Sequence, residues 1–299
     1  MTRRLSLEDL RGILLPTTTP FDADGQILSS AIASNLRAWS ATGVIGFVVL
    51  GSTGERVHLD EREYLHVIET SRQAVPDDLV FIVGAGQQST VNTIREINNA
   101  AAAGADAVLV ITPHYYRSAI TQETLVSFYT AVADASPVPL LLYSMPALTG
   151  IKIEPQTIAR LSEHGNIIGV KDSSNDVAGF AETVRLCPVD FAVMTGNGTV
   201  LLHALSAGAT GAILAVGCVV PEICVQIFRE RDPALQAKLT PLAAAVTTRF
   251  GIGGLKAALD MAGYTGGSVR APLQPPNESA RNEIASLLEA LVVSASSVA

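Results

Sequence analysis

Ile167-Ile168-Gly169-Val170-Lys171 is an apolar, β-forming stretch that ends on an amine. Long charged side chains normally lie in water, so a lysine that closes such a stretch needs an explanation. Either Lys171 leaves a strand into solvent, or it points into a buried site. Burial favours the neutral form of an amine, and a neutral amine can attack a ketone to form a Schiff base. The surrounding pattern decides between these two interpretations.

Similar short apolar runs recur along the first two-thirds of the chain. The eight candidate strands are 13–17, 46–50, 79–83, 107–111, 139–143, 167–171, 191–194 and 211–215. Nearly continuous apolar runs are typical of parallel strands that helices cover on both faces. Helix-like segments lie between them, for example 60–73, 91–103 and 122–135. This alternation predicts an α/β fold, a (β/α)8 TIM barrel. A doubly wound open sheet is the alternative, but no GxGxxG follows any strand.

The chain changes character near residue 220. Beyond it, the segments 221–231, 234–250, 254–263 and 277–293 have helical patterns, and no convincing strand is present. We therefore expect a catalytic barrel over residues 1–220 and a C-terminal helical extension over 221–299.

Composition excludes several classes of function. Of the 299 residues, 48% are hydrophobic and 16% charged, enough for a sizeable core, and the net charge is −8 without a basic run. Nucleic acids and anionic membrane surfaces are therefore not expected partners. The first residues lack the apolar region of a signal peptide, and no apolar run is long enough to span a membrane. Cys187, Cys218 and Cys224 show no metal spacing, which suggests reduced thiols and a cytoplasmic protein without a metal site.

Polar groups follow several of the expected strands, at the end where TIM barrels carry their active sites. Gly-Ser-Thr-Gly-Glu at 51–55 follows the second strand, and its backbone N–H groups could hold a carboxylate or form an ordinary turn. Tyr143 ends the fifth strand and could relay protons or simply pack at the rim. Tyr115 and Tyr116 follow the fourth strand and alone would suggest packing or an oligomer contact.

Together these features form one ordered constellation: Gly-Ser-Thr-Gly-Glu, Thr-Pro-X-Tyr-Tyr, Tyr-X-X-Pro-Ala-X-Thr-Gly and the strand-end Lys171. The constellation resembles the dihydrodipicolinate synthase / N-acetylneuraminate lyase superfamily of pyruvate-dependent class I aldolases, over nearly the whole chain. Within it, the segments 111–117, 142–150, 171–173, 245–252 and 270–274 are most similar to 4-hydroxy-2-oxoglutarate aldolase. The resemblance implies a lyase that cleaves a 4-hydroxy-2-oxo acid, such as 4-hydroxy-2-oxoglutarate, to pyruvate and a small aldehyde.

The resemblance also implies roles for individual residues. Lys171 would form the Schiff base, which makes a metal or other cofactor unnecessary. Tyr143 and the Ser52 hydroxyl would relay protons. Tyr115 would extend from a neighbouring subunit into the site, in a homotetramer built as a dimer of dimers. The expected substrate-binding residues include the backbone amides of Ser52 and Thr53 for the pyruvyl carboxylate and Ser173 for the distal part of the substrate; the full set is Thr53, Ser173, Gly196 and Ile213.

Two departures from the superfamily pattern narrow the substrate. Dihydrodipicolinate synthases have an arginine at the position of Leu148, where it binds a substrate carboxylate. Leucine has no N–H groups that could form the two parallel hydrogen bonds of an arginine–carboxylate pair. Sialic acid lyases carry an acidic pair after the seventh strand, where this chain has Gly-Asn-Gly-Thr at 196–199. Dihydrodipicolinate synthesis, or cleavage or dehydration of a 2-oxo-3-deoxy sugar acid, is the alternative reaction. A non-catalytic barrel that binds a 2-oxo acid is the alternative to an enzyme.

Overall fold

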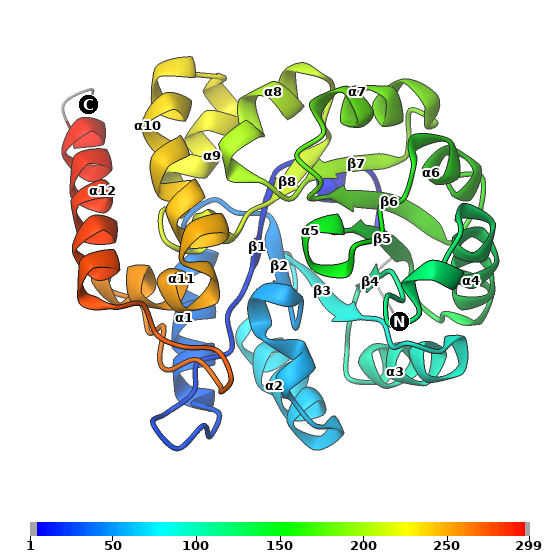
Figure 1. The fold of residues 1–299 in the computed structure, drawn as a ribbon, viewed down its shortest axis with the longest axis horizontal. Helices are drawn as coiled ribbons and strands as arrows, with labels where there is room; N and C mark the ends of the chain where they lie inside the picture. Colours follow the sequence, from blue (N-terminus) through cyan, green and yellow to red (C-terminus); the bar gives the residue numbers. More distant parts are fainter. Residues whose placement is uncertain (1–4, 297–299) are drawn as a thin grey trace.

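Eight parallel strands close into a barrel in the computed structural model of the chain, which describes residues 5–296. The strands follow one another in sequence order, and β8 pairs with β1 (Figure 1). They are β1 (Ile13–Pro16), β2 (Gly46–Val49), β3 (Val80–Ala85), β4 (Ala107–Ile111), β5 (Leu140–Ser144), β6 (Ile167–Asp172), β7 (Ala192–Thr195) and β8 (Gly211–Ile213). This order confirms the predicted TIM barrel and excludes the open doubly wound sheet, which has two edges.

Helices connect the strands and surround the barrel (Figure 1). They are α1 (Ser29–Ser40), α2 (Glu61–Ala74), α3 (Thr90–Ala102), α4 (Gln122–Ala135), α6 (Pro155–Leu161), α7 (Val177–Leu186) and α8 (Leu201–Ser206), with the short α5 (Pro146–Thr149) in the loop after β5. Local sequence sets several of the starts. The Asp60 side chain caps α2 in a capping box with Glu63, and the side chains of Ser89 and Thr121 cap α3 and α4.

Two apolar layers explain why the strands are hydrophobic throughout. Successive side chains of a strand point to opposite faces. Leu14, Val48 and Leu141 belong to a cluster inside the barrel, whereas Leu15 and Phe47 belong to the larger cluster between the strands and the helices. Since both faces are buried, no strand can alternate between polar and apolar residues.

The C-terminal part is helical, as the sequence predicts. It comprises α9 (Pro221–Glu230), α10 (Pro233–Ala244), a π-helical turn (Ala245–Arg249), α11 (Gly251–Met261) and α12 (Glu278–Ser296). In Figure 1, α10, α11 and α12 lie together on one side of the barrel. The expected boundary at residue 220 stays a prediction, because α9 packs against β1 in the manner of a barrel helix. Within residues 5–296, no helix is long and apolar enough to cross a membrane.

Candidate active site

Lys171 lies inside the barrel, near the carboxyl end of β6. It is in register with Tyr143 of β5 and Met194 of β7, both of which belong to the inner cluster. Its side chain is 5% exposed. The structure thus directs the amine into the barrel mouth, the second of the two interpretations that the sequence left open.

Tyr143 and Ser52 lie beside Lys171. The Lys171 amine is 4.5 Å from the centre of the Tyr143 ring, and the Tyr143 hydroxyl is 3.4 Å from Ser52 Oγ. The three residues come from β6, from β5 and from the turn after β2, so the closed barrel is what brings them together. Two hydroxyl groups in contact beside an amine can pass a proton between them.

The turn after β2 leaves two backbone donors free. Residues Ser52–Gly54 form a single 3-10 turn. Leu50 (φ 58°), two residues before it, and Glu55 (φ 53°), directly after it, are left-handed. In the part of the chain that the structure describes, the N–H groups of Ser52 and Thr53 donate to no other atom. Free N–H groups in a turn with left-handed residues form a concavity suited to an anion, here a carboxylate.

Gly84 makes this turn possible. A Cβ atom at this position of β3 would overlap the carbonyl oxygen of Leu50, so only glycine allows the left-handed Leu50 to lie against the strand. A strained backbone of this kind persists only where its surroundings hold it, and it is common at functional sites.

Ser173 and Gly196 also lie next to Lys171. The Gly196 N–H donates to the carbonyl oxygen of Asp172 (2.6 Å), which joins the loop after β7 to the end of β6. A Cβ atom at Gly196 would overlap Ser173 Oγ and lie 2.8 Å from Lys171 Cε. The missing side chain is therefore what leaves room for the amine. Ile213 is fully buried in the inner cluster at the end of β8.

Tyr115 is not brought to the amine within one chain. Its side chain is 75% exposed and stacks edge-on against that of Tyr116, with ring centres 5.0 Å apart. Only its backbone is fixed in place, through an N–H bond to Gln88 Oε1 (2.8 Å). Its expected role in a neighbouring subunit therefore stays a prediction.

A cavity of about 590 Å³ opens at this side of the mouth. Ser52 and Tyr143 line its inner part, and Leu148 of α5, which is 63% exposed, lies at its rim. The partly buried ion pair between Arg56 and Glu96 forms part of the wall. The cavity thus connects the Tyr143–Ser52 pair to solvent past an apolar side chain.

Three buried charged residues near the site were not among those expected from the sequence: Glu55, Asp172 and Lys256. Burial raises the pKa of the Asp172 carboxyl, although hydrogen bonds from Ser174 oppose the shift. The only sequence signal for Lys256 is its occurrence within an apolar helical run, in a chain with four lysines.

Among the described residues, no three His, Cys, Asp or Glu side chains are grouped so that they could bind a metal.

The fold and the site together are those of a TIM-barrel lyase with an active-site lysine. The chain belongs to the Dihydrodipicolinate synthetase family, which it matches over residues 9–291. It is 35% identical to the 4-hydroxy-tetrahydrodipicolinate synthase of Synechococcus sp. (strain CC9311), over 93% of this chain and 94% of the relative. The enzyme of the same name from Syntrophus aciditrophicus is 33% identical, over 93% and 97%.

Solved structures agree with this assignment. A dihydrodipicolinate synthase from Bacillus anthracis superposes with a TM-score of 0.89 at 28% identity, covering 94% of this chain and 98% of the other. YagE, a prophage protein of this family from E. coli K12 solved in complex with pyruvate, gives 0.87 at 29% identity, covering 94% and 98%. The superfamily predicted from the sequence is confirmed. The narrower resemblance to 4-hydroxy-2-oxoglutarate aldolase is not supported, since the curated relatives described above carry the synthase name.

Replacing Gly196 by alanine should displace the lysine without unfolding the barrel. The three nearest atoms that the new methyl group meets all belong to the side chains of Ser173 and Lys171, and the two closest, Ser173 Oγ and Lys171 Cε, can turn away. We expect the rate of borohydride-trapped Schiff base formation with pyruvate to fall about tenfold or more, because small misplacements of a reacting group are costly. The thermal midpoint should move little. Gly165→Ala, where a Cβ meets no atom within 4 Å, is the control. An unchanged trapping rate would contradict the packing argument.

Proposed function

We propose that Lys171 forms a Schiff base with C2 of pyruvate, or of the pyruvyl part of a larger 2-oxo acid. The observation that carries this proposal is the buried amine beside the Tyr143–Ser52 pair, next to two free backbone donors. The free N–H groups of Ser52 and Thr53 would bind the carboxylate while the amine attacks the adjacent ketone. The similarity to YagE, which was solved with pyruvate, supports the same ligand.

The reaction then follows from the Schiff base. The amine adds to C2 and water leaves, which gives a protonated imine. In cleavage, a base removes the 4-hydroxyl proton, the C3–C4 bond breaks, and its electrons move into the imine to give an enamine and a free aldehyde. Protonation of the enamine at C3 and hydrolysis release pyruvate and restore Lys171. Tyr143 and Ser52 would carry the protons, and the imine accepts the electron pair that a metal could otherwise stabilise.

The rest of the substrate, beyond the pyruvyl part, decides which reaction takes place. We favour cleavage of a 4-hydroxy-2-oxo acid, which releases a small aldehyde beside pyruvate. The specific observation is Leu148, which lies exposed at the rim where an arginine would be needed to bind a carboxylate through two hydrogen bonds. The second candidate is the synthase reaction, favoured by the names of the curated relatives. Aldolase or dehydratase activity on a 2-oxo-3-deoxy sugar acid uses the same Schiff base, and assays of substrates rather than fold distinguish these reactions.

Schiff base formation can be tested by mass spectrometry. Borohydride added with pyruvate should attach one pyruvyl-derived group to the protein, on the peptide that contains Lys171. Lys171→Met should abolish both labelling and turnover, whereas Lys238→Met, which alters an exposed lysine, should change neither. Labelling at another residue would refute the mechanism. Labelling of Lys171 without turnover on any substrate of the panel below would favour the non-catalytic binding barrel.

The substrate can be assigned by measuring pyruvate release from 4-hydroxy-2-oxo acids and 2-oxo-3-deoxy sugar acids, and condensation of pyruvate with aspartate semialdehyde. We expect release from a 4-hydroxy-2-oxo acid to be the fastest reaction. Leu148→Arg should raise the condensation activity, because it supplies a guanidinium to a substrate carboxylate, whereas Leu148→Met should not. A wild-type kcat/KM for condensation of about 10⁴ M⁻¹s⁻¹ or more would instead establish the synthase reaction.

We further propose that Tyr115 completes the site of a neighbouring subunit in a homotetramer. Val57 and Leu148 are exposed and line the cavity at the mouth, and the exposed Tyr115 and Tyr116 follow directly after His114, another lining residue. Large exposed apolar side chains are typical of protein interfaces. One similar structure is described as a monomeric dihydrodipicolinate synthase variant, at 29% identity and a TM-score of 0.90, so the assembly has to be measured for this chain. The free thiols Cys187, Cys218 and Cys224 fit the cytoplasmic location that we also propose.

Subunit mixing tests the shared site. Tyr115→Phe and Lys171→Met subunits should each be nearly inactive alone. After they are unfolded and refolded together, some sites would combine an intact Tyr115 with an intact Lys171, so activity should recover to a fraction of wild type. Mixing Lys171→Met with Tyr143→Phe subunits is the control. Lys171 and Tyr143 lie in the same barrel, so every barrel in the mixture would still lack one of these two residues, and activity should not recover. A monomer by light scattering would end the proposal.

A further inference from the structure

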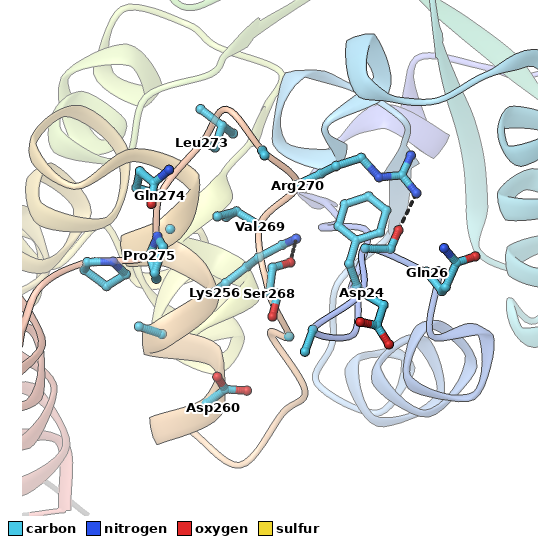
Figure 2. A pocket seen from close by; sticks show the side chains of 18 of the residues that line it. Asp24, Gln26, Lys256, Asp260, Ser268, Val269, Arg270, Leu273, Gln274 and Pro275 are labelled. Carbon is cyan, nitrogen blue, oxygen red and sulfur yellow. Dashed lines mark hydrogen bonds between the residues drawn. The ribbon is translucent and has the colours of Figure 1, made fainter.

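Lys256 is a buried lysine of the C-terminal part that the mechanism above does not use. Its side chain is 1% exposed, and Nζ donates to the carbonyl oxygens of Thr19 (2.8 Å) and Ser268 (2.6 Å). The same nitrogen lies 2.5 Å from Oε1 of Glu55. Figure 2 shows Lys256 extending from α11 toward the segment that contains Ser268. Burial lowers the pKa of the Lys256 amine, and the Glu55 carboxylate opposes this shift.

Glu55 directly follows the Ser52–Gly54 turn after β2. Its backbone is left-handed, a conformation that residues other than glycine rarely adopt, and the residue is 2% exposed. Its other carboxylate oxygen, Oε2, accepts the Arg270 N–H (3.0 Å) and contacts His58 Nδ1 (3.2 Å). Two of the three groups that hold this carboxylate, Lys256 and the Arg270 N–H, therefore come from the C-terminal part of the chain.

The same lysine reaches the turn by a second route. Thr19, whose carbonyl oxygen accepts from Lys256, donates its hydroxyl to the carbonyl oxygen of Gly54 (2.7 Å). Lys256 is thus joined to the turn directly through Glu55 and indirectly through Thr19. Residues 54 and 55 immediately follow Ser52 and Thr53, whose N–H groups are free.

Polar contacts hold the buried Lys256 amine at the wall of a cavity. A cavity of about 880 Å³ lies between the loop after β1 and α11, and Lys256 and Arg270 are among its lining residues (Figure 2). The Phe21 ring lies 4.5 Å from the Lys256 amine and 4.4 Å from the Arg270 guanidinium. Arg270 is itself held by both carboxylate oxygens of Glu63 at 2.7 Å.

We propose that Glu55 and Lys256 are positioning residues for the substrate carboxylate. Their ion pair holds the left-handed end of the turn, and this directs the N–H groups of Ser52 and Thr53 to the carboxylate of the bound 2-oxo acid. The C-terminal part is then required for substrate binding although it supplies no group that touches substrate. The inference rests on the proposed function, because it assumes that a 2-oxo acid binds at Lys171.

The test compares a substrate that has the carboxylate with one that lacks its charge. Rates of borohydride-trapped Schiff base formation are measured with pyruvate and with methyl pyruvate, for wild type, Glu55→Gln, Lys256→Met and the double variant. If the pair positions the carboxylate donors, the preference for pyruvate over the ester should fall about tenfold or more, as expected for weakened hydrogen bonds to a charged group. The rate with the ester should stay within about threefold of wild type. A purely structural role would lower both rates together.

Arg249→Met is the matched control, because Arg249 also belongs to the C-terminal part but pairs with Glu283 of α12. It should leave the preference unchanged. The double variant removes the pair without leaving one buried charge uncompensated, so it carries the test if a single variant fails to fold. An unchanged preference in the folded double variant would overturn the inference. Failure of pyruvate to label Lys171 in the wild type would instead refute the proposed function.

Discussion

The register of the closed barrel is the constraint on which the rest of the structure depends. Parallel strands bring all their carboxyl ends to one rim, and the pairing of β5, β6 and β7 sets Tyr143, Lys171 and Met194 at one level inside it. A shift of one residue in β6 would turn the amine outward among the helices. Closure removes the sheet edges, so no strand can slide without breaking its pairing on both sides. The chemical site is therefore as rigid as the barrel itself.

Glycine at close backbone contacts maintains that register. A Cβ atom at Gly169 of β6 would lie 2.6 Å from the carbonyl oxygen of Ala192 in β7, and one at Gly84 would overlap that of Leu50. The Gly169 contact joins β6 to β7 two residues before Lys171. The Gly84 contact joins β3 to the end of β2, where the turn with the free N–H groups begins. The positions that lack a side chain thus determine how closely the strand that carries Lys171 and the turn with the free N–H groups approach their neighbours.

Local signals predicted the barrel and drew attention to Lys171, whereas the expected roles of Tyr143 and Ser52 came from the family resemblance. A strand buried on both faces is a continuous apolar run, and a polar residue at its end is visible without the fold. The Glu55–Lys256 pair was not predicted, since nothing near either residue identifies a partner so distant in the sequence. Tyr115 remains a prediction because its proposed partner belongs to another chain. The narrower resemblance to one aldolase is not supported by the relatives, because the segments around Tyr143 and Lys171 are expected to handle pyruvate, which the whole family has in common.

The proposed mechanism assigns the two halves of the substrate to different kinds of structure, and this would explain why the family identifies one half only. Backbone N–H groups and a strand-borne amine would bind the pyruvyl half, and they cannot change without altering the barrel. The aldehyde half would meet side chains on loops, such as Leu148 on α5, which is exposed and packs against little. Replacing such a side chain changes stability by only about 0.5 kcal/mol, so aldehyde specificity can diverge while the fold and the Schiff base chemistry stay the same. In this mechanism, the chemistry at C2 and C3 would be common to this chain and to its relatives at 33–35% identity, and the loop residues of this chain would specify the aldehyde.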